Sequence, residues 1–397
     1  VMTMADNKDK KVLNVPALRF PEFTEEWRKD ILQNVVMFSN GKAHENCVDE
    51  NGHYILVNSK FVSTDGSVFK KVTAQLSPLF KSQFVMVMSD LPNGKALAKC
   101  YYIEEDNIYT LNQRICSFSA INGNISRFLM YQICRNKYYL RFDDGINQTN
   151  LKKREVLACP VFIPSKEEQT KIAVFLHLLD KRISIQNKII EDLRLLRDAI
   201  MVEHYRKCNK SELYIYDIGE PFNVMNLSKD DLTKDGSPCI IYGELFTTYG
   251  CVIENVVSHT TKSPNSTLST KGDLLFPAST TVDALSLIAP SSINEDGIIL
   301  GGDMFGIHVN EQYNSNYLSY YFNIIGKKNL AKYAKGSTII HLHYADIQKV
   351  KITLPNKNEQ ETVANLLLKV EHKLNIEQKM LINYLNTKNF LLRQMFI

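Results

Sequence analysis

An internal repeat constrains this chain more than any other feature of its sequence. Residues 164–173 begin with Pro164 and contain Gln169, and they resemble residues 355–364, which begin with Pro355 and contain Gln360, at an offset of 191 positions. Two copies of this length account for nearly all of the 397 residues. Solenoid repeats are roughly 20–50 residues long, so a repeat of this size is a duplicated domain.

Each copy ends in a segment with the spacing of a long helix. Apolar residues recur at steps of three, four and seven, the heptad pattern of a helix that packs along one seam. We predict two such helices of about 35 residues, roughly 50 Å each at 1.5 Å per residue. The seam residues are Leu176, Leu179, Ile183, Ile190, Leu193 and Ile200 in the first copy, and Leu367, Val370, Leu374, Leu381, Tyr384 and Leu391 in the second.

Polar residues interrupt both seams at matching places. Gln186 corresponds to Glu377, and Arg197 corresponds to Lys388. Polar seam residues fix the register of a helix pair at some cost in stability. The matched interruptions therefore predict that the two helices pack on each other in one register. A helix pair alone is equally typical of a dimerisation device, but its position after each globular copy favours a spacer.

The leading part of each copy is predicted to be mixed α/β and rich in strands. Short β-favouring runs at residues 54–57, 84–88 and 239–242 lie between turn signals such as Asn51-Gly52 and Asp235-Gly236. We predict short helices at 127–135 and 316–322. A strand is expected before each long helix, at 159–163 in the first copy and at 350–354 in the second. We call residues 20–163 the first head and residues 208–354 the second head.

Together these patterns predict an α+β chain with two tandem mixed α/β heads. The expected order is an N-terminal arm (1–19), the first head, a first long helix (164–207), the second head, and a second long helix (355–397). The two helices are expected to pack as an antiparallel coiled coil with pseudo-two-fold symmetry.

Composition excludes several classes of protein. Charged residues make up 23% and hydrophobic residues 44%, which is ordinary globular composition. No apolar run approaches the roughly 18–20 residues of a membrane span, and no secretory signal is visible near the N-terminus. The eight cysteines contain no CxxC pair, so reduced thiols in a cytoplasmic protein are expected rather than a zinc site or a disulfide framework.

Signatures of catalysis are missing from the sequence. It contains no GxxxxGK[ST] phosphate loop, no GxSxG and no HExxH motif, and no amino-methyltransferase motif. His341 and His343 lack a third ligand at a metal-like spacing, and the acidic pair Asp143-Asp144 is interpreted as a solvated loop. The sequence therefore predicts no catalytic residue and no metal site in this chain.

Basic residues gather at corresponding places in the two copies. Residues 127–154 contain seven basic and two acidic residues, and residues 327–354 contain six basic residues and one acidic residue. Aromatic residues are interleaved with them. Duplicated basic patches suit the neutralisation of phosphates, although a charge run is more commonly a plain solvated face.

The combination is similar to the DNA-specificity subunits of type I restriction–modification systems. The resemblance rests on residues 16–23 (PALRFPEF) with Trp27, on Leu111-Asn-Gln-Arg114, on Gly336-Ser-Thr338, and on the helix starts at Pro164 and Pro355. It covers nearly all of the chain in the order head, helix, head, helix. The Trp27 region has no clear counterpart in the second copy, so the heads have diverged and are expected to read different sequences.

The resemblance implies a non-catalytic organiser of a larger complex. In this family each head grips one half of a split target in double-stranded DNA, and the antiparallel helices hold the heads apart. Two modification (methyltransferase) subunits dock on the helices and heads, and restriction subunits join them. S-adenosylmethionine, ATP and magnesium are then expected in the partner subunits and not in this chain.

The DNA contacts are hypotheses at the level of single residues. The expected phosphate contacts are Lys137, Arg141 and Lys152 in the first head, and Lys328, Lys332 and Lys335 in the second. Possible base readers lie in loops around Lys42, Lys60, Lys95, Lys262 and His341. Two other readings stay open here, namely a coiled-coil adaptor that binds only protein and a nuclease with an unrecognised site.

Overall fold

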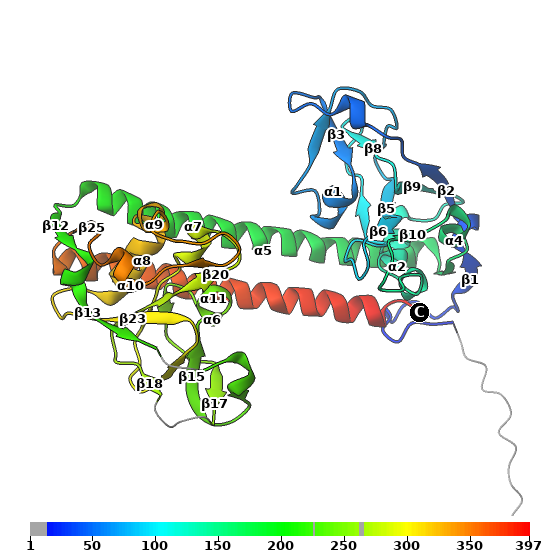
Figure 1. Ribbon diagram of the computed structural model, residues 1–397. Coiled ribbons are helices and arrows are strands. Elements are labelled where there is room, and N and C mark those ends of the chain that lie inside the picture. Colours follow the sequence, from blue (N-terminus) through cyan, green and yellow to red (C-terminus); the bar gives the residue numbers. More distant parts are fainter. Residues whose placement is uncertain (1–13, 225–226, 262–265) are drawn as a thin grey trace, which may run out of the picture. The chain divides into compact units, whose positions relative to one another are not determined.

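The computed structural model describes residues 14–224, 227–261 and 266–397. The chain forms two compact units (Figure 1). The first unit contains the residues up to Ile185 together with Leu381–Ile397, and the second contains Gln186–Met380. Residues 1–13 of the predicted arm lie outside the described residues.

The first unit is built on a four-stranded sheet in the order β2-β9-β5-β7, which is antiparallel throughout. A smaller sheet, β4-β3-β8, contains the parallel pair β3–β8. The elements are β1 (Arg28–Ile31), β2 (Val36–Asn40), β3 (Tyr54–Val57), α1 (Ser59–Ser63), β4 (Lys70–Val72), β5 (Phe84–Val87), β6 (Ser89–Asp90), β7 (Cys100–Tyr102), β8 (Tyr109–Leu111), β9 (Ile115–Ala120), α2 (Ser126–Ile133), α3 (Lys137–Leu140), β10 (Thr149–Asn150), α4 (Lys153–Leu157) and β11 (Pro160–Ile163).

The second unit repeats this plan, but both of its sheets have five strands. The order β13-β23-β19-β21-β16 corresponds to the main sheet of the first unit, and β14-β17-β15-β22-β18 contains the parallel pair β15–β22. The elements are β12 (Ser211–Tyr214), β13 (Gly219–Asn223), β14 (Leu232–Thr233), β15 (Ser237–Ile241), α6 (Glu244–Thr247), β16 (Val252–Ile253), β17 (Ser258–Thr260), β18 (Thr267–Leu268), β19 (Asp273–Pro277), β20 (Ser279–Thr280), α7 (Ala284–Leu287), β21 (Ser291–Ile293), β22 (Ile299–Gly301), β23 (Met304–Val309), α8 (Ser315–Ile324), α9 (Lys327–Ala331), β24 (Ile340–His341), α10 (Tyr344–Ile347) and β25 (Lys351–Leu354).

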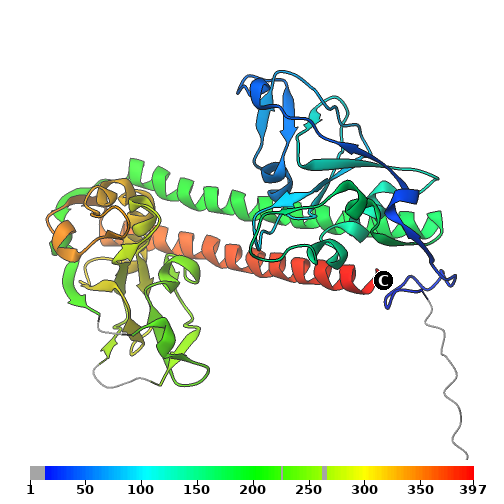
Figure 2. The ribbon, with the colours of Figure 1, turned by 45° about the vertical axis from the view of Figure 1, so that its right-hand side comes forward.

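The two long helices are α5 (Lys166–Lys207) and α11 (Lys357–Gln394), drawn in green and in orange to red in Figures 1 and 2. They have 42 and 38 residues, so both are longer than the predicted 35. The C-terminal parts of both helices bury apolar side chains: Met201 on α5 belongs to the main core of the second unit, and Leu391 on α11 belongs to that of the first.

The helices run antiparallel to each other within each unit. In the first unit Asp180 contacts Lys388 and Arg182 contacts Tyr384. In the second unit Gln186 donates to the backbone carbonyl of Glu377 at 3.1 Å, and Arg197 pairs with Glu371. Every predicted seam residue is buried or half-buried, whereas neighbours such as Leu178, Leu195 and Ile382 are exposed. The predicted fold class is confirmed in these features.

The short predicted elements are also present, with shifted ends. The run at 127–135 corresponds to α2, the run at 316–322 to α8, and the strands before the long helices to β11 and β25. The sequence did not reveal that the first strand of each head returns to the last one. β1 pairs with β11 and β12 pairs with β25, both antiparallel, so each head closes immediately before its long helix begins.

Candidate nucleic-acid interface

Each head is fixed to the start of its long helix by a buried glutamine. In the first unit Gln169 donates to the carbonyl of Pro164 at 3.0 Å and accepts from the amide of Ile125 at 2.9 Å, directly before α2. In the second unit Gln360 donates to the carbonyl of Pro355 at 2.8 Å and accepts from the amide of Asn314, before α8, at 2.9 Å. The repeated proline and glutamine are therefore a joint between head and helix.

A second attachment exists in the first unit. The carboxylate of Glu168, which is 1% exposed, accepts two hydrogen bonds from Arg19 at 2.7 and 2.8 Å and one from the indole of Trp27 at 3.2 Å. The amide of Leu18 donates to the carbonyl of Gln394 at 2.8 Å. These contacts fasten the segment before β1 to both long helices. They give the sequence around Arg19 and Trp27 a structural role.

Ion pairs between the long helices recur at equivalent places in the two units. In the first unit Lys388 lies 2.5 Å from Asp180, which also accepts a hydrogen bond from the hydroxyl of Tyr131 on α2. Burial raises the pKa of Tyr131, and the nearby carboxylate of Asp180 raises it further. In the second unit Arg197 lies 3.3 Å from Glu371. The polar interruptions of the two seams are therefore interhelical contacts.

The predicted phosphate contacts of the first head all lie on its exposed surface. Lys137 begins α3, Arg141 follows α3 directly, and Lys152 precedes α4. The guanidinium of Arg141 stacks 4.1 Å from the ring centre of Tyr138, which holds that charge over an aromatic surface.

The corresponding lysines of the second head differ in their surroundings. Lys328 lies on α9 and Lys332 at its C-terminal end, and both are exposed. Lys335 forms an ion pair of 2.5 Å with Asp346, and this contact lowers the pKa of that carboxyl. Lys335 is therefore engaged within the protein, in contrast to its two neighbours.

The possible base readers are spread over several elements. Lys42 and Lys95 lie in loops, as predicted, and are exposed. Lys60 lies on α1 rather than in a loop, and His341 lies on β24, where its ring is 3.9 Å from the carboxylate of Asp303. Lys262 lies outside the described residues.

Each head contains a short two-stranded ribbon whose second strand follows a basic segment in the sequence. β6 pairs with β10 in the first head, and β20 pairs with β24 in the second, both antiparallel. β6 follows β5 and β20 follows β19, which are equivalent strands of the two main sheets. The loop before β10 follows α3, and the loop before β24 follows α9, so each ribbon lies next to a basic helix in the sequence.

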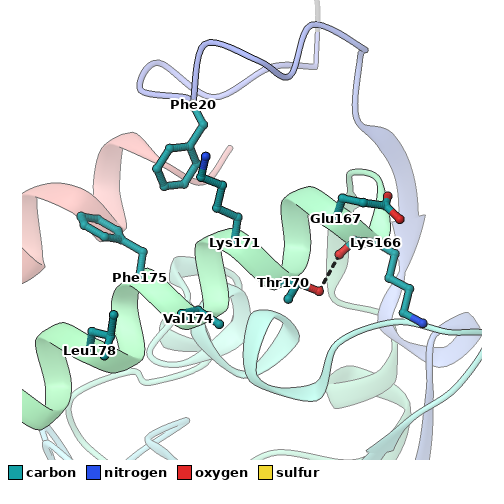
Figure 3. Close-up of a pocket in the computed structure, with 8 residues that line it drawn as sticks. All are labelled: Phe20, Lys166, Glu167, Thr170, Lys171, Val174, Phe175 and Leu178. Carbon is teal, nitrogen blue, oxygen red and sulfur yellow. Dashed lines mark hydrogen bonds between the residues drawn. The ribbon is translucent and has the colours of Figure 1, made fainter.

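A shallow apolar groove of about 590 Å³ lies along the first turns of α5 (Figure 3). Phe20 meets Phe175 edge to face, and Val174 and Leu178 line the same groove. The ammonium of Lys171 lies 4.6 Å from the ring centre of Phe20. Asn365 and Lys369 stand at the positions of Val174 and Leu178 in the second copy, which therefore lacks two of the apolar side chains that line this groove.

The part of the chain that the structure describes holds no group of three or more His, Cys, Asp or Glu side chains arranged to bind a metal ion. None of the helices in these residues has both the length and the hydrophobicity of a membrane span.

The comparison with protein families decides what kind of chain this is. The family model for the type I restriction modification DNA specificity domain matches residues 24–195 and again residues 215–386. The chain belongs to this family. The two matches are the two copies of the internal repeat, each made of a head and most of the helix that follows it.

Individual relatives agree with this assignment. A putative type I restriction enzyme specificity subunit, MjaX, from Methanocaldococcus jannaschii is 24% identical over 258 residues, which cover 59% of this chain and 58% of that protein. The match thus spans less than two thirds of the relative's length. The specificity subunit of M. genitalium has the same fold, with a TM-score of 0.65 and 15% identity over 96% of this chain and 99% of that one. A chain from a structural study of assembly and conformational transition in the type I system matches with a TM-score of 0.50 and 14% identity over 93% and 97%.

Sequence reasoning missed two features of this specificity-subunit chain. One is the attachment of Arg19 and Trp27 to Glu168, because contacts between distant segments leave no local pattern. The other is a set of exposed aliphatic side chains in the ribbon loops. A signal for these existed, since Leu91, Ile146 and Val282 each stand among turn-forming residues, where an aliphatic side chain has no core to enter.

Proposed function

We propose that this chain is the DNA-reading subunit of a type I restriction–modification complex and that its two heads bind the two halves of an asymmetric split target. One observation carries the proposal: two copies of the specificity domain share one scaffold within a single chain, but they differ in their outer sheets and loops. A shared scaffold with different loops suits two heads that dock in the same manner and read different bases.

The charge distribution supports contact with DNA. Exposed basic residues lie on or beside α3 and α4 in the first head and α9 in the second, at equivalent places in the two folds. Lysine and arginine near phosphates position the duplex and make binding sensitive to salt, whereas base edges supply specificity. We infer that Lys137, Arg141, Lys152, Lys328 and Lys332 serve mainly in positioning.

The exposed faces of the long helices support a docking role. After the interhelical seam is packed, aliphatic side chains remain on the outer surface of both helices, including Leu178, Leu195, Ile376 and Ile382. Exposed apolar area of this kind typically marks a protein interface. We propose that modification subunits cover it and that they supply S-adenosylmethionine and the catalytic residues. Restriction subunits with ATP and magnesium would join that complex, and this chain itself would not be catalytic.

The test is single-molecule methylation sequencing of host DNA with the gene intact and with the gene deleted. The proposal predicts that N6-methyladenine disappears at one split motif, and the lost motif then gives both half-sites and the gap. An active modification system whose methylation is unchanged by the deletion would contradict the proposal. In that case the chain would be an adaptor that binds only protein.

A further inference from the structure

The most exposed large hydrophobic side chains of the described residues share one structural position. They are Ile146 (79% exposed), Val282 (71%) and Leu91 (68%). Leu91 follows β6, Ile146 lies in the loop before β10, and Val282 follows β20. The loop before β24 presents Ile339, which is also exposed. Single exposed aliphatic residues are common on protein surfaces, but here the loops of two equivalent ribbons each carry one.

The loop around Ile146 is held rigidly by its own side chains. The carboxylate of Asp144 accepts from the amides of Ile146 at 2.9 Å and Asn147 at 2.8 Å, and Asp143 accepts from the amide of Gly145 at 3.0 Å. Since these amides are already satisfied, the loop presents Ile146 to solvent with a fixed backbone. Less backbone conformational entropy is then lost when this side chain meets a partner.

The loop around Leu91 is held in the same way and is joined to the first loop. Asp90 accepts from the amides of Leu91, Ala96 and Leu97 at 2.9, 2.7 and 3.0 Å. The side-chain amide of Asn93 donates to the carbonyl of Gly145 at 3.2 Å. Leu91 and Ile146 therefore project from one connected loop pair.

The second head repeats the arrangement with different residues. The amide of Val282 donates to the hydroxyl of Thr280 at 3.2 Å, and Asp283 caps α7 by accepting from the amide of Ser286 at 2.7 Å. On the partner loop, Lys335 and His341 exchange two backbone hydrogen bonds at 2.9 and 2.7 Å, which close the turn that carries Ile339. Different sequences thus produce the same kind of exposed, fixed aliphatic tip.

Cationic residues lie at the Leu91 loop of the first head and on the helix that packs against α7 in the second. Arg135 donates to the carbonyls of Gly94 and Leu97 in the Leu91 loop, and Lys95 lies exposed in that same loop. In the second head, α7 packs against α9, which carries Lys327 and Lys328. The carboxylates of Asp90, Asp144 and Asp283 are occupied by loop amides. An apolar tip with a cationic rim fits a DNA groove, whose base edges offer apolar contacts between two rows of phosphates.

We propose that the ribbon loops of each head press an aliphatic side chain against the bases of its half-site, with Leu91 and Ile146 acting in the first head and Val282 in the second. The inference rests on the proposed function and assigns specificity-determining residues within it. The shared chemistry is apolar contact with DNA bases. It is achieved either at a thymine methyl group or by entry into a base step.

The experiment uses the chain assembled with modification subunits and a duplex that carries the split motif found by methylation sequencing. The variants are Ile146→Ser and Val282→Ser. The matched control is Met37→Ser, because Met37 on β2 is 66% exposed but lies on neither ribbon. We expect each ribbon variant to bind its motif about tenfold more weakly and a scrambled duplex equally well, as loss of one good base contact predicts. The control should match the unmodified chain on both duplexes.

Two modified duplexes distinguish the two kinds of base contact. If Ile146 touches a thymine methyl, replacing one thymine of the half-site by uracil weakens binding of the unmodified chain but not of Ile146→Ser. If Ile146 enters a base step, the fluorescence of 2-aminopurine placed at that step increases when the unmodified chain binds, but not when the variant binds. Either result supports the proposal.

Three outcomes would overturn it. Ribbon variants that bind the motif as tightly as the unmodified chain would show that the tips do not touch the bases. Variants that lose modification subunits during gel filtration would show that the tips belong to a protein interface. If even the unmodified chain bound the motif and the scrambled duplex equally well, the proposed function itself would fail, which is a distinct result.

Discussion

Helices α5 and α11 both begin two residues after a proline, and both carry a buried glutamine in the first turn that bonds back to that proline and across to the head. The residue before the glutamine is a glutamate in both helices, but its surroundings differ. Glu168 is buried against Arg19 and Trp27, whereas Glu359 bonds to Asn356 at the exposed start of α11. The glutamine joint is thus common to both units. The contact of Glu168 with Arg19 and Trp27, which we call the clamp, is found among the described residues in the first unit alone.

Chain connectivity explains this difference. The second head receives its first strand directly from α5, because only residues 208–210 separate Lys207 from β12. Within the described residues 14–27 no helix leads into β1, and this segment is held by contacts with the long helices instead. The contacts of Arg19 and Trp27 with Glu168 replace the covalent connection that the second unit has. Features present in both units therefore indicate what every head requires.

The largest expected effect distinguishes the two units at this clamp. Glu168→Ala leaves a mostly buried guanidinium and a buried indole N–H without their acceptor, and we expect it to destabilise the first unit by about 3 kcal/mol. Glu359→Ala is the matched control and should cost less than about 1 kcal/mol, because its contact is exposed. Hydrogen exchange at the amides of β1 and β12 reads the two units separately. Equal protection at β1 in both variants would contradict the clamp.

Substitution of the glutamine should destabilise both units by a similar amount. Gln169→Leu and Gln360→Leu each leave a carbonyl and an amide at the head–helix junction without a partner, and we expect each to cost about 1–3 kcal/mol. Urea unfolding measures the loss of stability in each variant, and hydrogen exchange shows which unit has lost it. A loss in one unit only would show that the joint is not the common element described here.

The interhelical ion pairs should have similar strength but different sensitivity to salt. Asp180→Asn and Glu371→Gln are each expected to cost about 1 kcal/mol. The first pair is half-exposed, whereas Glu371 and Arg197 are more buried. Screening acts mainly on exposed charges, so 0.5 M salt should reduce the effect of Asp180→Asn more than that of Glu371→Gln. Thermal unfolding at two salt concentrations provides the test, and the opposite order would contradict it.

The smallest expected effect concerns two lysines of the second head. Lys332→Ala should weaken DNA binding across all sequences and reduce the salt slope by about 1, as removal of one phosphate contact does. Lys335→Ala should change the slope less, because Lys335 already pairs with Asp346. Binding to a non-specific duplex over a series of salt concentrations compares them. If Lys332→Ala left both affinity and slope unchanged, that assignment would be wrong.

Periodic and repeated features were predictable from the sequence, and contacts between distant segments were not. The heptad spacing and the matched Gln186 and Glu377 were enough to predict a helix pair in one register, because both depend on local periodicity. The repeated glutamines were visible as letters, but their bonds to Ile125 and Asn314 depend on how the head folds back. Pairing of β1 with β11 also escaped, since the strands lie more than a hundred residues apart and only folding brings them together.

The candidate site was harder to predict than the fold. Charge runs indicated basic patches at corresponding places in the two copies but did not distinguish Lys332 from Lys335, because an ion pair with Asp346 is a property of the folded surface. The aliphatic tips were overlooked, since hydrophobic residues were read as core or seam. The turn-forming residues around them were a signal, but the exposure of these side chains is established only in the folded loops.

An exchange of heads tests the central claim most directly. Residues 28–163 would be replaced by the equivalent head of another specificity subunit, which leaves Arg19, Trp27 and both long helices unchanged. Methylation sequencing of cells carrying the hybrid should show one new half-site, with the other half-site and the gap length as before. A change in both half-sites, or a change in the gap alone, would contradict an account in which each head reads one half of the target and the helix pair sets the distance.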